Sequence, residues 1–309
     1  MGRLEQALES GKFGVTVEMA PPKGYDFTEQ MEAAELLKGK VHGINVTDMQ
    51  SACLKASSLG LCIKLKQEGL EPIIQMTGRD RNRMGIMGDV LSAASFGIDT
   101  MLALTGDHPV VGDCKQSKPV YDLDSVGILE MLTLMEATGK DCGGNDLAGG
   151  APKFYKGAAV TPVYEPLFLQ INKLRQKVDA GAKYIQTQGI FDLESFKRFM
   201  DEVDKAGIRT HIMAGIIPLK TAGMAKYMNE NVPGIAVPQS MIDRLSAAAA
   251  EGKEKGIKGL PMQLGIEMAA EMIAKIKDEK ICDGVHIMAI GAEKNVPAIL
   301  EKAGLQIEA

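Results

Sequence analysis

The stretch Arg79 to Pro109, RDRNRMGIMGDVLSAASFGIDTMLALTGDHP, contains the pattern that decides the fold. Its polar opening leads into a predicted helix, which Gly97 would end because glycine adopts positive φ at little cost. The apolar run TMLAL, Thr100 to Leu104, then predicts a buried parallel strand. The inner face of the helix is expected to carry Met84, Met87, Val90, Leu91 and Ala94.

A carboxylate stands just beyond this strand, in the turn Thr105-Gly106-Asp107-His108-Pro109. Enzymes built from alternating strands and helices keep their chemistry at the C-terminal ends of the strands. Asp107 is therefore a candidate functional residue. The alternative is that Asp107 only caps a turn, since Gly-Asp before proline is common in loops.

The same strand and helix unit recurs along the whole chain. Apolar runs predict strands at 15–19, 43–48, 71–77, 100–104, 155–161, 184–191, 210–217 and 283–290. Amphipathic segments predict helices at 27–38, 52–67, 125–138, 167–180, 193–206, within 221–250, at 261–277 and at 296–303. The composition shows no break, so we expect one α/β domain over residues 1–309, most simply a single (β/α)8 TIM barrel. An open doubly wound sheet is the alternative, although no GxGxxG follows the first strand.

Composition argues against several classes of protein. The net charge of −5 does not suit a general nucleic-acid binder, and no apolar run reaches the roughly 20 residues that span a bilayer. The N-terminal segment MGRLEQALESGKF has no signal-peptide core, so we expect a cytoplasmic protein. The five cysteines form no CxxC pair and the four histidines show no ligand spacing, so no metal site is predicted.

Polar side chains stand at the C-terminal end of almost every predicted strand. Burying a polar group without a partner costs a few kcal/mol, so a shared ligand explains the set better than isolated core residues do. No nucleophile–base pair or metal triad is evident, which favours binding of a flat, heteroatom-rich ligand. The set comprises Glu18, Thr47, Asp48, Gln75, Thr77, Thr105, Asp107, Thr161, Gln186 and Gln188.

Five sequence blocks, in order along the chain, resemble the 5,10-methylenetetrahydrofolate reductase family. They are VEMAPP around Glu18, RDRNR…GI…LTGD ending at Asp107, KVDAGA at 177–182, TQGIFD at 187–192 and GIIP at 215–218. The resemblance implies a flavin-containing (β/α)8 barrel. It also implies reduction of methylenetetrahydrofolate to methyltetrahydrofolate by hydride transfer from reduced flavin.

The resemblance also implies roles for individual residues. Glu18 matches the general acid that helps open the imidazolidine ring, giving the iminium that accepts hydride; the alternative is a buried, paired carboxylate. Asp107 matches the aspartate near the flavin that holds the pterin, and Gln188 matches a glutamine that contacts folate. The flavin-contacting positions correspond to Thr47, Asp48, Gln75, Thr105, Gly106, Asp107, Tyr121, Asp122, Ala158, Tyr164, Gln170 and Lys177.

Some positions depart from the family pattern. Gln75 and Tyr164 stand where histidine is usual, and Gln170 replaces an acidic residue associated with the adenine of FAD. The resemblance implies FAD as the cofactor, and these departures make FMN the alternative. Met224 and Met228 occupy the region where other members hold folate or nicotinamide, so NAD(P)H and an electron-transfer partner subunit are both open as donors.

Two alternatives to a self-sufficient reductase remain at this point. One is a barrel subunit of a larger complex that takes electrons from a partner. The other is a folate-binding methyltransferase, which would lack flavin. We also expect the chain to form an oligomer.

Overall fold

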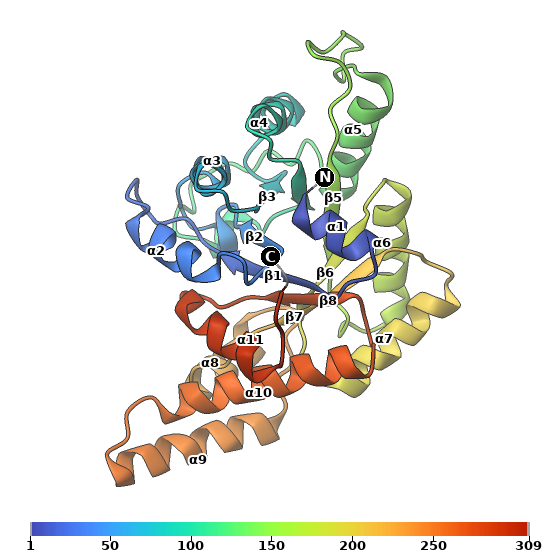
Figure 1. Ribbon diagram of the computed structural model, residues 1–309. Helices are drawn as coiled ribbons and strands as arrows, with labels where there is room; N and C mark the ends of the chain where they lie inside the picture. Colours follow the sequence, from blue (N-terminus) through green and yellow to red (C-terminus); the bar gives the residue numbers. More distant parts are fainter. Residues whose placement is uncertain (1, 308–309) are drawn as a thin grey trace.

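Eight parallel strands form a closed barrel in sequence order in the computed structural model, which describes residues 2–307 (Figure 1). The barrel closes where the first and last strands pair, with Thr16 opposite His286. The predicted (β/α)8 barrel is confirmed and the open sheet is excluded. The strands are β1 Gly14–Met19, β2 Gly43–Val46, β3 Pro72–Thr77, β4 Thr100–Leu104, β5 Tyr155–Val160, β6 Tyr184–Gly189, β7 His211–Ile216 and β8 Gly284–Ile287.

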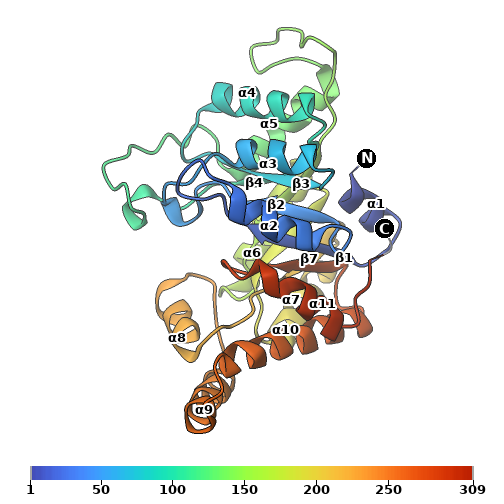
Figure 2. The same cartoon turned by 60° about the vertical axis from the view of Figure 1, so that its left-hand side comes forward.

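Helices surround the barrel, and three of them lie between β7 and β8. Of these three, α9 (Gln239–Lys255) and α10 (Leu260–Asp278) pack against each other and extend away from the strands (Figure 2). None of the described helices has the length and apolarity that a membrane crossing requires. The helices are α1 Arg3–Glu9, α2 Thr28–Leu37, α3 Ser58–Gln67, α4 Arg83–Ser95, α5 Ser125–Thr138, α6 Leu167–Asp179, α7 Leu193–Lys205, α8 Ala222–Asn231, α9 Gln239–Lys255, α10 Leu260–Asp278 and α11 Val296–Lys302, with short 3-10 turns η1 Gln50–Ala52, η2 Pro109–Val111 and η3 Glu293–Asn295.

The segment between β2 and α3 differs from its prediction. The helix begins at Ser58 rather than at residue 52. Met49, Ser51 and Ala52 have φ of 48°, 56° and 55°, a left-handed conformation that non-glycine residues rarely adopt. The second predicted strand is also too long, because β2 ends at Val46 and the chain then turns across the barrel mouth.

Helix α4 forms where it was predicted, but one residue predicted for its inner face is exposed instead. Asn82 caps it by accepting a hydrogen bond from the Gly85 N–H at 3.1 Å. Ile86, Val90 and Ala93 are buried, whereas Met84 is 74% exposed. The buried residues are spaced four and three apart, as one helix face requires, and Met84 lies in the first turn outside that face.

The inside of the barrel has two layers. At the N-terminal end, α1 lies over the strands (Figure 1). Its leucines pack against the inward side chains of the strands at that end. Gly157 leaves room for a tyrosine there, since a Cβ on Gly157 would lie 2.2 Å from Cζ of Tyr184. This apolar layer, which we call the lower layer, consists of Leu4, Leu8, Ile73, Leu102, Tyr155, Tyr184 and Met213. Above it, most of the inward side chains are polar.

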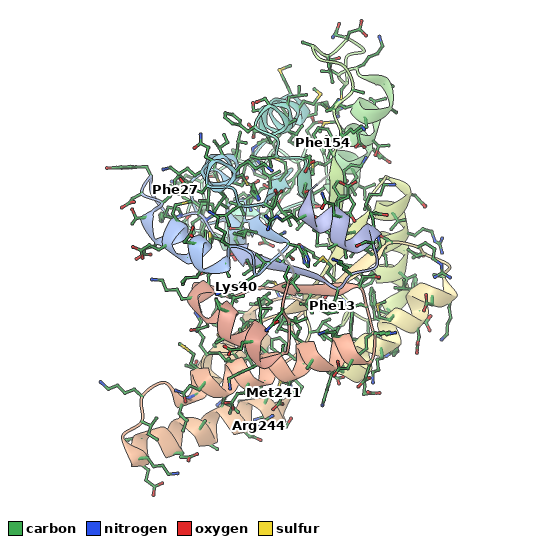
Figure 3. All side chains as sticks on the ribbon, viewed as in Figure 1. Phe13, Phe27, Lys40, Phe154, Met241 and Arg244 are labelled. Carbon is green, nitrogen blue, oxygen red and sulfur yellow. The ribbon has the colours of Figure 1, made fainter. Side chains whose placement is uncertain are left out.

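A second apolar layer fills the space between the strands and the surrounding helices. Figure 3 labels Phe13, Phe27 and Phe154, all of which pack in or against this layer. The strands therefore bury apolar side chains on their outer face and free their inner face for the polar set. This arrangement positions the site at the C-terminal mouth.

Candidate active site

A cavity of about 490 Å³ opens at the C-terminal ends of the strands. Its volume is in the range of small-molecule and cofactor sites. The inward-facing residues that line it are Glu18, Gln75, Thr77, Leu104, Ala159, Gln186, Gln188, His286 and Met288. All residues of the predicted polar set except Thr47 therefore line one cavity.

Glu18 lies at the floor of this cavity, near the end of β1. Its side chain is largely buried; Oε1 accepts a hydrogen bond from Nε2 of Gln50 at 3.1 Å. Oε2 lies 3.8 Å from Nε2 of His286. In the part of the chain that the structure describes, no lysine or arginine pairs with Glu18, so its carboxyl group is available for proton transfer at the cavity surface.

A hydrogen-bonded chain of buried side chains continues below Glu18. Nδ1 of His286 lies 2.9 Å from Oγ1 of Thr16, which accepts a hydrogen bond from Nε2 of Gln186 at 3.1 Å. Gln186 and Asn45 then exchange two amide hydrogen bonds, of 2.9 and 3.1 Å. His286 thus links Glu18 to the buried polar side chains below it.

Sequence reasoning missed His286 because it is 270 residues from Thr16 along the chain. The signal that could have found it is strand alternation: His286 follows Gly284 at a spacing of two in β8, and Thr16 and Glu18 alternate in the same way in β1. Pairing the first and last strands brings these inward positions together.

Asp107 lies on the other side of the cavity, on the loop after β4. Its side chain is exposed, lines the cavity and accepts no hydrogen bond from the described residues, so it does not act as a turn cap. Its backbone oxygen accepts a hydrogen bond from Nη1 of Arg79 at 3.3 Å. Gly106 has φ of 88° and lies close to Thr77, where a Cβ would be 3.1 Å from that of Thr77. A glycine is therefore needed to bring Asp107 to the cavity.

Arg79 supports two loops of the mouth and was predicted only as part of a polar opening. It is 2% exposed, and it pairs with Asp80 through Nη2 at 2.6 Å. Its Nη2 also donates to the backbone oxygen of Met49 at 3.1 Å. Arg79 thereby ties the left-handed segment after β2 to the Asp107 loop.

Asp48 lines the cavity, but its carboxylate is already occupied. Nη1 and Nη2 of Arg81 donate to its two oxygens at 2.7 and 2.9 Å. The backbone N–H and the hydroxyl of Thr77 also donate to it, at 2.8 and 2.9 Å. These contacts join β2 to β3, so Asp48 shapes the cavity rather than offering a free charge.

A cationic side of the cavity comes from α6. Gln170, Lys173 and Lys177 line it, as predicted for Gln170 and Lys177. Burial, followed by the nearby charge of Lys173, lowers the pKa of Lys177 to about 8. The Lys177 ammonium donates to the backbone oxygen of Ala159, and no described carboxylate forms an ion pair with it. A half-buried cation without a carboxylate partner is suited to an anion such as phosphate.

Of the predicted flavin positions, Asp48, Gln75, Thr105, Gly106, Asp107, Gln170 and Lys177 line the cavity. Glu18 and Gln188 line it too, and the Gln188 side chain accepts a hydrogen bond from the Gly189 N–H at 3.0 Å. Thr105 also accepts a hydrogen bond from the N–H of Ser125 at 3.2 Å, at the start of α5.

Five predicted positions lie outside the cavity lining. The Thr47 hydroxyl is buried without a partner among the described residues, and the Tyr121 hydroxyl donates to the backbone oxygen of Gly106 at 3.1 Å. Asp122 is exposed, and its hydrogen bonds with Arg83 lower its pKa to about 2. Tyr164 is 41% exposed.

Ala158 is the fifth of these positions. It is fully buried in the layer between the strands and the helices, and its neighbour Ala159 lines the cavity instead. The two alanines differ by one position in β5, which places their side chains on opposite faces of the sheet.

Comparisons with known proteins agree on one family. A family model described as methylenetetrahydrofolate reductase matches residues 3–304. The 5,10-methylenetetrahydrofolate reductase of Salmonella typhimurium is 25% identical over 311 residues, which cover 98% of this chain and 95% of that protein. The protein of the same name from Pectobacterium carotovorum is 29% identical over 224 residues, covering 70% of this chain and 68% of that protein.

Some relatives are much longer. The probable methylenetetrahydrofolate reductase (NADPH) of Caenorhabditis elegans is 24% identical over 255 residues, which cover 82% of this chain. This chain spans about a third of that relative, 34% of its length.

One solved structure adds evidence for the fold. An uncharacterized protein from Clostridium thermocellum that binds two copies of 5-methyl-5,6,7,8-tetrahydrofolic acid has a TM-score of 0.65 and 14% identity, covering 97% of each chain. At this identity the likeness shows the barrel fold alone. The family match is stronger evidence, because it includes every strand that contributes to the cavity. The chain therefore belongs to the methylenetetrahydrofolate reductase family.

Proposed function

We propose that the protein is a flavin-dependent methylenetetrahydrofolate reductase. The observation that carries the proposal is that a buried acid, Glu18, and an unpaired carboxylate, Asp107, open on one cavity that also exposes the cationic Lys177. Family membership supports the folate substrate. The Clostridium thermocellum protein, which shares the barrel fold, binds a folate.

The residues present fit a flavin. Lys177 is a half-buried cation that pairs with no described carboxylate, and it offers a site for phosphate. The small side chain of Ala159 and the backbone of the Thr105–Gly106 turn leave room for a flat ring. The proposed cofactor is FAD, with FMN as the alternative because Gln170 lacks the charge associated with the adenine end. When bound, reduced flavin would supply the hydride that converts the methylene bridge to a methyl group.

The chain's own residues would control protons and charge. Glu18 would give a proton to the nitrogen that leaves as the imidazolidine ring opens, which leaves a cationic iminium. The exposed carboxylate of Asp107 would stabilise that cation, as charge placed in advance does in enzyme sites. Gln188 would hold the folate from β6.

The electron donor is proposed separately. Met224 and Met228 belong to the apolar cluster around Ile217 and Leu245 rather than to the cavity lining. Neither methionine therefore offers a surface for nicotinamide inside the cavity. A partner subunit that reduces the flavin is accordingly proposed beside NAD(P)H as the source of electrons.

A visible spectrum and a half-reaction test the proposal. The purified protein should show flavin absorbance at about one flavin per chain, and the reduced protein should convert methylenetetrahydrofolate to methyltetrahydrofolate without oxygen. Glu18→Gln should bind flavin and be reduced by a viologen dye, but lose folate turnover roughly 10²-fold, the scale of acid catalysis.

A colourless protein that cannot be reconstituted with FAD or FMN would overturn the proposal and favour the methyltransferase alternative. Reduction by the dye but not by NADH or NADPH would assign the donor to a partner subunit.

A further inference from the structure

The hydrogen-bonded chain of buried side chains beneath Glu18 leads from Asn45 through Gln186 and Thr16 to His286. Thr16 and Asn45 are fully buried, Gln186 is 2% exposed and His286 is 3% exposed. Each makes its hydrogen bonds with another member of the chain, and only His286 faces Glu18. The set lies directly above the apolar lower layer, so few other partners are within reach.

The donor and acceptor roles at His286 depend on its tautomer, and the hydrogen bonds around it favour one of the two. Gln186 uses one N–H for Asn45 and the other for Thr16. The Thr16 oxygen therefore already accepts a hydrogen bond, and its own O–H remains to be donated. The acceptor within reach is Nδ1 of His286, at 2.9 Å. A neutral histidine that accepts at Nδ1 carries its proton on Nε2.

The Nε2 atom of His286 faces the acid. Nε2 lies 3.8 Å from Oε2 of Glu18. We propose that His286 is a positioning residue for Glu18, held by Thr16, Gln186 and Asn45 as the tautomer whose Nε2–H points at the Glu18 carboxyl group. The inference rests on the proposed function, in which Glu18 is the acid.

The consequence concerns the moment after Glu18 has given up its proton. A carboxylate left beside an N–H donor is stabilised, whereas one left beside a nitrogen lone pair is repelled. The opposite tautomer, with the proton on Nδ1, would turn that lone pair toward Glu18. The buried threonine hydroxyl therefore sets the electrostatic environment of an acid that it does not touch.

Thr16 allows a matched pair of variants. Thr16→Val removes the hydroxyl at nearly constant shape, and Thr16→Ser keeps it. We expect Thr16→Val to lose folate turnover about tenfold or more, with flavin content and reduction by a viologen dye unchanged, and Thr16→Ser to keep its turnover. Tyr184→Phe is the control, because it removes another buried hydroxyl of the barrel interior, which bonds the Met101 carbonyl at 3.0 Å. It should leave turnover unchanged.

The second measurement does not depend on activity. Nitrogen-15 NMR of the histidine side chains distinguishes the two tautomers, and the chain has four histidines to assign. His286 should be the Nε2–H tautomer in the wild type and in Thr16→Ser, and should change in Thr16→Val. This signal is read on the wild type even if Thr16→Val fails to fold.

The outcomes separate the inference from the proposed function. An Nδ1–H tautomer in the wild type, or equal folate turnover in Thr16→Val and Thr16→Ser, would overturn the inference. A wild type that holds flavin but reduces no folate would overturn the proposed function, and the tautomer measurement would still decide the arrangement of His286.

Discussion

Two carboxylates open on the same cavity in opposite surroundings. Glu18 is buried and faces His286 and Gln50. Asp107 is exposed, and its side chain accepts no hydrogen bond from the described residues. A buried acid suits proton transfer and a free anion suits charge stabilisation, so the two environments correspond to two different tasks.

Asp107→Asn should change the flavin and the folate reaction in opposite senses. An anion beside the flavin opposes additional negative charge on the ring, so its removal should raise the flavin midpoint potential. The same change should slow folate reduction, because the cationic iminium loses its counter-charge. Redox titration and single-turnover kinetics would measure the two effects.

The matched control is Asp113→Asn. Asp113 lies on the same connection between β4 and α5, but pairs with Lys23. Asp113→Asn should leave the flavin midpoint potential unchanged. An unchanged flavin potential in Asp107→Asn, with folate turnover intact, would show that the Asp107 carboxylate contributes to neither effect.

Lys177 should make flavin binding depend on pH. Burial lowers its pKa to about 8, so the ammonium is charged below that pH and is lost above it. Affinity for a phosphate-bearing flavin should therefore be constant below about pH 8 and fall as the pH rises through that value. Lys177→Met should bind about tenfold or more weakly and lose this pH dependence.

Fluorescence titration of flavin-free protein with FAD and with FMN would measure both effects. Lys205→Met on α7 is the control, because that lysine pairs with Glu202 away from the cavity. The same pH dependence in wild type and Lys177→Met would remove Lys177 from the phosphate site.

At the scale of single elements, the packing of β5 depends on a glycine, which has no side chain. The position of Gly157 above Tyr184 leaves no space for a Cβ, and both neighbouring layers are packed. Gly157→Ala should therefore destabilise the protein by about 1–3 kcal/mol, the usual cost of overpacking. Urea unfolding would measure the change.

Gly88 offers the opposite test. It lies within α4, and a Cβ there would meet nothing within 4 Å. Gly88→Ala should stabilise the protein by about 0.5–1 kcal/mol, because alanine is the better helix former. Equal effects at the two positions would contradict the packing of the lower layer.

Elements with a regular pattern were predictable from sequence. The predicted strand 100–104 and helix 125–138 agree with β4 and α5 in the structure. The segment after β2 was not predictable, because Met49, Ser51 and Ala52 take positive φ, which their side chains disfavour. Contacts across the mouth, such as that of Arg79 with Met49, impose that conformation.

The candidate site was predictable where it depended on strand ends. Glu18, Gln75 and Gln188 follow directly from strand alternation. His286 did not, since its role depends on the closure of β8 onto β1, which is a property of the complete barrel. The family resemblance predicted a flavin contact at Ala158. Because successive side chains of a strand point to opposite faces, Ala159 lines the cavity instead.

At the scale of the whole molecule, one histidine joins three distant parts of the chain. His211 begins β7, and its ring nitrogens lie 3.6 Å from Oε1 of Glu9 in α1 and 3.7 Å from Oδ1 of Asp283 before β8. The Asp283 carboxylate, and then that of Glu9, raises the pKa of His211 above 6.5. These groups lie at the N-terminal end of the barrel, away from the cavity.

This raised pKa predicts how stability depends on pH. The stabilisation is fully present below the unfolded pKa of 6.5 and is lost as the pH rises through the higher folded pKa. The free energy of unfolding of the wild type minus that of His211→Gln should therefore fall with rising pH across this window. His42 gives the contrast, because burial lowers its pKa, so the same difference for His42→Gln should rise with pH.

The apolar lower layer closes the barrel at its N-terminal end, so the barrel is not an open channel. Leu4 and Leu8 close its base, and the polar cavity is reached from the rim. Because the cavity is entered from this rim, a nicotinamide that reduces the flavin and a folate that the flavin reduces would compete for the same entrance. The two substrates would then have to bind alternately. Initial-rate plots with NADH or NADPH should then give parallel lines, whereas intersecting lines would mean that electrons arrive by a second entrance.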